Sequence, residues 1–152
     1  MTDARLTTVL RPQDVVLGFR AGSLREAVDS LLRPRLVARG LDAVGADEAI
    51  DSVMHREAQG STCAGAVAVP HARISGIAAF VAALAVNPAG VYADDDAPRL
   101  LLSFVSPVDA AAAHLRFLSS VAKAFRRESV IADLLEAKDG ARVLDVLNAI
   151  GA

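Results

Sequence analysis

Four side chains of this sequence, three imidazoles and one thiol, have the chemistry of a nucleophile. A neutral imidazole attacks through a ring nitrogen at pH 7 because its ordinary pKa is about 6.5. His71 has the most defined setting, in the stretch GSTCAGAVAVPHARISG at residues 60–76. Pro70 fixes its own φ and holds Val69 extended, so the ring of His71 should leave the end of a short strand in a set direction. We expect it to be presented rather than buried, although a loop histidine that caps a turn fits the spacing at least as well.

The residues around His71 carry almost no side chain: Ala64, Gly65, Ala66, Ala68 and Ala72. Small residues let the surface of another protein come close to the backbone. The sequence therefore predicts that residues 63–66 and Ala72 are exposed and would lie under a partner protein.

The spacing gives less support to other reactions. A dyad of Cys63 and His71 is possible in space, but no motif favours it. His55, His71 and His114 have no short zinc-binding spacing, either alone or with the aspartates at 94–96. The glycines of the stretch are not followed by the Gly-Lys-Ser/Thr of a phosphate-binding P-loop. We expect neither a metal ion nor a cofactor.

The composition limits the class of partner. The 152 residues are 53% apolar, which suits one compact domain over residues 1–152. Sixteen basic and eighteen acidic residues leave a net charge of −2, so no basic surface for nucleic acid is indicated. The longest apolar run, residues 77–86, is about half a bilayer span, and the first residues have no apolar signal segment. We expect a cytoplasmic protein that binds proteins or small molecules and does not insert into a membrane.

Strands and helices alternate in the first part of the chain. A strand over residues 14–19 precedes a helix that Ser23 caps and that Pro34 should end or kink. A second helix begins at Ala46 or Asp47 and reaches Arg56.

The second half adds two apolar strands and then helices only. The runs at 78–87 and 99–106 are nearly all apolar, which predicts strands buried on both faces. From Asp109 onward the pattern is helical to the end. This order of elements favours a three-layer α/β domain.

Two further side chains could serve a site at His71. His114 shares a helical stripe with Leu118, Val121 and Phe125, so it should point inward, near the positive end of a helix for which Asp109 is a candidate N-cap. A core histidine bonded to a backbone carbonyl fits that position equally well. Arg56 carries a planar guanidinium suited to phosphate oxygens, and on its own it also fits a solvated cation at a helix end.

The segment REAQGSTCAGAVAVPHARISGI resembles the surroundings of the phosphorylated histidine in the fructose/mannitol class of enzyme IIA proteins of the bacterial phosphoenolpyruvate-dependent phosphotransferase system, which includes a nitrogen-regulatory branch. The family pattern is R-E-x-x-G-S-T, a turn of small residues, then V-A-[IV]-P-H-[GA]-R and a glycine. The matching residues are Arg56-Glu57, Gly60-Ser61-Thr62, the run from Val67 to His71, Arg73 and Gly76. Three later segments also resemble family elements: PRLLLSFVSP, HLRFLSSVAKAF and VIADLLEAKDGARVLDVL.

The resemblance implies a phosphocarrier with a mixed, about five-stranded sheet flanked by helices. His71 would accept a phosphoryl group from the general histidine phosphocarrier protein and pass it to a cysteine of a IIB domain, in trans, during uptake of a sugar or sugar alcohol. Arg56 and His114 match the residues that stabilise the phosphoryl group in the family, whereas His55 has no counterpart and is taken as structural. The alternative is a regulatory module whose phosphorylation state controls protein partners without sugar transport.

Two features depart from the family pattern. The turn GSTCAGAVA is one residue shorter than usual and has Cys63 and Ala66 in place of glycines. Ala72 replaces the glycine that usually follows the active histidine. Both changes lie beside His71, so we expect them to affect the choice of partner.

Overall fold

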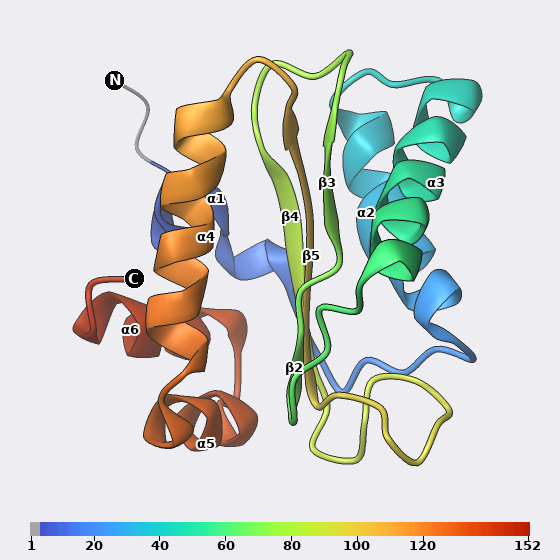
Figure 1. The fold of residues 1–152 in the computed structure, drawn as a ribbon. Helices are drawn as coiled ribbons and strands as arrows, with labels where there is room; N and C mark the ends of the chain where they lie inside the picture. Colours follow the sequence, from blue (N-terminus) through green and yellow to red (C-terminus); the bar gives the residue numbers. More distant parts are fainter. Residues whose placement is uncertain (1–3) are drawn as a thin grey trace.

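The computed structural model describes residues 4–152, and a mixed five-stranded sheet runs through its centre (Figure 1). The strands lie in the order β1, β4, β5, with β2 and β3 both paired to the far edge of β5. β4 and β5 are antiparallel, and the other pairs are parallel. The bounds are β1 Val15–Leu17, β2 Val67–Ala68, β3 His71–Ile74, β4 Val81–Val86 and β5 Leu100–Pro107.

Helices cover both faces of the sheet, which gives three layers (Figure 1). Two of them, α2 and α3, pack on one face, while α1, α4, α5 and α6 lie on the other. Every residue of β4 and β5 is buried, as the apolar runs predict. The bounds are α1 Leu6–Val9, α2 Leu24–Ala38, α3 Ala43–Gln59, α4 Ala111–Phe125, α5 Glu128–Glu136 and α6 Gly140–Ala149, with a 3₁₀ turn η1 at Pro12–Asp14. The predicted three-layer α/β architecture is confirmed.

The two helices before the site differ from the prediction in their bounds. Ser23 caps α2 as expected, but the helix continues through Pro34 to Ala38. The proline ring is exposed and Leu36 beyond it is fully buried, so core packing outweighs the backbone hydrogen bond that proline removes. α3 begins three residues earlier than expected because the side chain of Asp42 accepts a hydrogen bond from the Gly45 amide.

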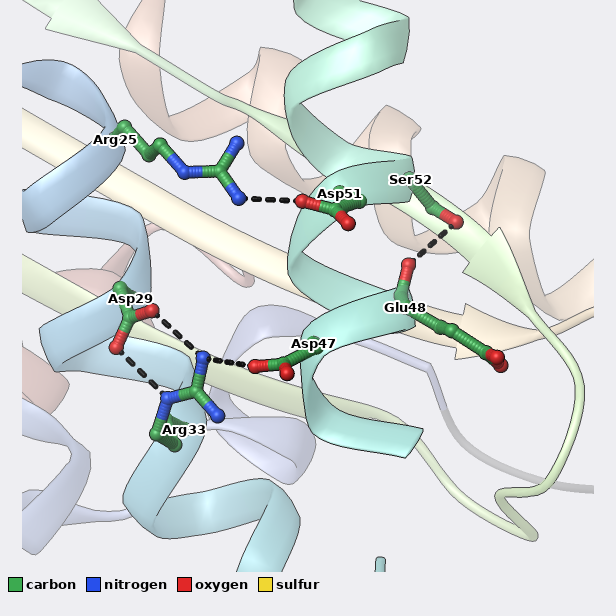
Figure 2. A network of polar contacts seen from close by, with 7 residues as sticks. All are labelled: Arg25, Asp29, Arg33, Asp47, Glu48, Asp51 and Ser52. Atoms are coloured by element: carbon green, nitrogen blue, oxygen red, sulfur yellow. Dashed lines mark hydrogen bonds and ion pairs between the residues drawn. The ribbon is translucent and has the colours of Figure 1, made fainter. Parts of the chain in front are cut away.

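An ion-pair network crosses from α2 to α3 (Figure 2). Arg33 binds Asp29 in its own helix and Asp47 in α3, and Arg25 pairs with Asp51. These groups lie at the surface, where water and salt screen them, so the network adds little to stability. Its effect is to favour one alignment of the two helices, and the last turn of α3 contributes to the site described below. None of the helices in residues 4–152 has the length and apolar content to cross a bilayer.

Candidate functional site

His71 is the first residue of β3 and is held against the neighbouring strand. Its ring is half-buried and stacks on Phe104 of β5, with centroids 4.9 Å apart and an interplanar angle of 3°. The carbonyl of Pro70 accepts hydrogen bonds from the Ser103 hydroxyl at 3.0 Å and the Phe104 amide at 3.3 Å. His71 therefore begins β3 shortly after β2 ends, and its ring is less exposed than the sequence predicts.

A backbone carbonyl fixes the tautomer of His71. Nδ1 lies 2.7 Å from the carbonyl oxygen of Val69. Because a carbonyl can only accept, Nδ1 carries the proton in the neutral ring, and the lone pair is on Nε2. The ring thus has one defined nucleophilic atom.

The segment that supplies this carbonyl is anchored by a buried carboxylate. Glu57, near the end of α3, accepts hydrogen bonds from the amide and hydroxyl of Thr62. The Thr62 oxygen in turn accepts the Val69 amide at 3.2 Å. A chain of contacts therefore runs from Glu57 through Thr62 and Val69 to His71. This chain of contacts gives a physical role to Glu57 and Thr62 of the motif, for which the sequence alone suggested no role.

His114 lies beside His71 on the inward side of α4. The two ring centroids are 5.6 Å apart, and His114 is buried, as its helical stripe predicts. Its Nδ1 lies 2.6 Å from the hydroxyl of Ser106, so its partner is a side chain and not a backbone carbonyl. Asp109 is not the N-cap: Ala110 occupies that position without a side-chain hydrogen bond, because the helix begins one residue later than predicted.

A basic cavity of about 300 Å³ brings the three predicted site residues together. No Asp or Glu among residues 4–152 lines it, so it favours an anion. The Arg56 guanidinium uses one N–H on the Gly60 carbonyl at 3.0 Å, and the Arg73 guanidinium donates to the Val108 carbonyl. The lining residues are Ser52, His55, Arg56, His71, Ala72, Arg73 and His114.

An apolar groove of about 470 Å³ borders the other side of His71. It lies between the turn before β2 and the C-terminal half of α4, whose C-cap residue Arg126 also lines it. Its apolar lining is Ala64, Val67, Val69, Leu118, Val121, Ala122 and Phe125. His71 therefore lines both the basic cavity and the apolar groove.

The expectation that residues 63–66 and Ala72 are exposed is only partly right. Ala64 and Gly65 are exposed, but Ala68 and Ala72 are 2% and 8% exposed. Side chains alternate across a strand, so Ala72 points away from the His71 side into the core beneath α2 and α3. Ala72 therefore contributes to packing, and a large residue there would disturb the core.

The alternative nucleophile and the metal site gain no support. Within residues 4–152 no hydrogen bond joins Cys63 to His71. Burial, with the nearby charges of Glu57 and Asp96, raises the pKa of the Cys63 thiol, which disfavours the thiolate that a dyad needs. In the described part of the chain, no three His, Cys, Asp or Glu side chains form a metal-binding group.

Burial lowers the pKa of both histidines of the site. For His71, the Arg56 charge adds to this effect, while the Val69 carbonyl and Glu57 oppose it. For His114, the charges of His71 and Arg73 add to burial. Both rings are therefore neutral at pH 7, and His71 keeps its Nε2 lone pair.

An NMR titration of His71 is expected to give a midpoint below 6.5. The folded state disfavours the protonated ring of His71 more than the unfolded state does. The contribution of His71 to the free energy of unfolding is therefore complete above pH 6.5, and it is lost as the pH falls through the lowered pKa. Arg56→Gln removes a positive charge and should move the midpoint upward. A wild-type midpoint at or above 6.5 would contradict the environment described here.

Two side chains of the site were missed by sequence reasoning. Phe104 supports the ring of His71, and Ser106 holds His114. The alternation along β5 places both on the same face of the sheet, and Ser106 is one of two hydroxyl residues, with Ser103, that interrupt an otherwise apolar run. That interruption is the signal that could have identified it.

Comparison with known proteins agrees with this geometry. The family model described as phosphoenolpyruvate-dependent sugar phosphotransferase system, EIIA 2, matches residues 8–150. The chain belongs to this family, as the motif around His71 indicates. No curated protein sequence matches it significantly.

Solved structures of the same class share the fold. The nitrogen regulatory protein IIA-Ntr from Neisseria meningitidis is 25% identical, with 93% of this chain and 98% of that chain covered and a TM-score of 0.78. IIA mannitol from Escherichia coli is 22% identical, with coverage of 91% and 98% and a TM-score of 0.69. The complex of enzyme IIAMtl and phosphorylated enzyme IIBMtl from Escherichia coli matches at 23% identity, with coverage of 92% and 97% and a TM-score of 0.69.

Proposed function

We propose that the protein is a phosphohistidine carrier that accepts a phosphoryl group on Nε2 of His71. The observation that carries this proposal is that His71, whose Nδ1 is bound to the Val69 carbonyl and whose Nε2 keeps its lone pair, lines both the basic cavity and the apolar groove. A phosphoryl group on this atom would enter a cavity lined by Arg56, Arg73 and His114. Phosphoryl transfer depends mainly on such positioning and charge stabilisation.

The transfer step uses the fixed tautomer. The Nε2 lone pair forms a bond to phosphorus while the P–N bond of the donor phosphohistidine breaks, and the donor imidazole leaves with that electron pair. His71 keeps the Nδ1 proton, so positive charge develops on its ring. The Val69 carbonyl, 2.7 Å from Nδ1, stabilises this charge.

The donor and acceptor are proposed to be protein domains. The donor is the general histidine phosphocarrier protein, and the acceptor is the cysteine of a IIB domain. The apolar groove gives such a domain a surface to bind beside the reacting atom, and the phosphorylated IIB partner in the Escherichia coli complex is a precedent. In the onward step the thiolate attacks phosphorus, and the electron pair of the P–N bond returns to Nε2.

A regulatory role is the second candidate. Among the structures compared above, the nitrogen regulatory protein has the highest TM-score and identity. In that role His71 would still be phosphorylated by the phosphocarrier, and the charge added beside the groove would control the binding of a protein target.

One experiment separates the two roles. The chain is charged with phosphoenolpyruvate and the two general phosphotransferase proteins, isolated, and mixed with each IIB domain of the source cell. Rapid loss of label to one IIB cysteine supports the transport relay. Persistence of the label against every IIB domain, with normal charging, contradicts the relay and supports regulation. Absence of charging contradicts both.

A further inference from the structure

A second basic cleft lies near the edge of the sheet opposite to β3. It is about 270 Å³ in volume and opens between η1, the last turn of α2 and the start of β4. β1 pairs with β4 only at Leu84–Val86, so the cleft lies where the edge of β4 is no longer covered by β1. The charged and amide side chains that line it are Arg11, Gln13, Asp14, Arg35 and Arg39.

The only carboxylate of this cleft in the described part of the chain is already satisfied. Asp14 is 4% exposed and accepts hydrogen bonds from the amide and Nε of Arg11 and from Nε of Arg35. Arg35 also donates from Nη1 to the carbonyl of Leu31 and from Nη2 to the carbonyl of Gln13. These contacts hold Asp14 and Arg35 in place, and we call these two residues the floor of the cleft. Three arginines and one aspartate leave the cleft with an excess of positive charge.

Two guanidinium groups remain available above this floor. Arg11 binds Asp14 through Nε alone, and its side chain is 55% exposed. The Arg39 side chain makes no hydrogen bond or ion pair within residues 4–152, and neither does the side-chain amide of Gln13. The two arginines come from different walls, since Arg11 precedes η1 and Arg39 is the C-cap of α2.

We propose that this cleft binds a small dianion, such as a dicarboxylate or a phosphate monoester. Guanidinium groups bind carboxylate and phosphate oxygens through paired N–H donors, and two of them from different elements in one cleft suit a ligand with two negative charges. The volume lies just below the roughly 300–1,000 Å³ of typical ligand pockets, which limits the ligand to a small metabolite. This site is separate from the phosphoryl cavity and does not depend on the proposed phosphotransfer.

The test is an NMR titration of the full-length ¹⁵N-labelled chain with succinate and, separately, with inorganic phosphate. Sodium chloride keeps the ionic strength constant, so that screening alone causes no change. We expect saturable shifts at Arg11, Gln13, Arg39 and Ala82, with a Kd of about 1 mM or tighter. Succinamide, which has the same length without charge, should cause none.

Variants assign the binding to the cleft. Arg11→Gln and Arg39→Gln should each weaken binding roughly tenfold, whereas Arg142→Gln on α6, outside the cleft, should leave it unchanged. Phosphate binding that is weakened by Arg56→Gln would be binding in the cavity at His71 and not in the arginine cleft. Arg35 is kept because its contacts hold the floor. The proposal is overturned if neither anion gives saturable shifts, or if the double variant of Arg11 and Arg39 binds as the wild type does.

Discussion

Replacement of His71 by alanine is expected to abolish phosphorylation of the chain by phosphoenolpyruvate and the general phosphotransferase proteins. The reason is that Nε2 of His71 is the proposed acceptor, and no neighbouring group is placed to replace it: His114 is buried against Ser106, and the Cys63 thiol has a raised pKa. Phosphoryl transfer is measured by radiolabel and intact mass, with one phosphoryl group per wild-type chain. The label should be lost in acid and kept in alkali, as for a phosphoramidate.

Two controls make this result specific. His55→Gln removes the exposed histidine on the rim of the same cavity and should keep one phosphoryl group per chain. ³¹P–¹⁵N correlation on the wild type should place the group on Nε2, since Nδ1 is bound to the Val69 carbonyl. Equal labelling of His71→Ala and wild type would show that another residue is the acceptor.

Replacement of Arg56 by alanine is expected to slow charging by roughly 10- to 150-fold, because a hydrogen bond to a charged group is worth about 1.5–3 kcal/mol. The Arg56 guanidinium is anchored at Gly60 and reaches the cavity with its remaining donors. Single-turnover transfer from the phosphocarrier measures the rate. Arg56→Lys keeps the positive charge but not the planar pair of N–H donors, so it should recover only part of the wild-type charging rate. A wild-type rate in Arg56→Ala would show that the arginine is a bystander.

His114→Ala should slow charging by a similar factor but also lower stability. Its removal leaves the buried hydroxyl of Ser106 without its partner, at a cost of about 1–3 kcal/mol. The double variant His114→Ala, Ser106→Ala removes both groups, so it should recover stability without recovering the rate. Recovery of the rate together with stability would mean that His114 acts only in folding.

The sequence predicted which residues lie around the cavity better than it predicted their surroundings. The helical stripe predicted the inward position of His114, and the family resemblance pointed to Arg56 and His71, which line the same cavity. The burial of Ala72 was not predicted, because the segment His71–Ile74 was not assigned as a strand, although its polar and apolar residues alternate. The continuation of α2 through Pro34 was also missed, because it depends on the packing of Leu36 against elements distant in sequence. The stacking partner Phe104 lies 33 residues after His71, and only the pairing of β3 with β5 brings them together.

The parallel stacking of His71 on Phe104 has a spectroscopic consequence. Phe104 also stacks on Phe80, at 6.3 Å between centroids, and Phe80 borders the arginine cleft. Protons above the face of an aromatic ring are magnetically shielded, so the His71 ring signals should lie upfield of those of His55, whose ring is exposed. Any shift of β3 against β5 would reduce that shielding. A one-dimensional proton spectrum would thus report the geometry of the acceptor before any phosphoryl group is added, and an effect of cleft occupancy would appear in the same signals.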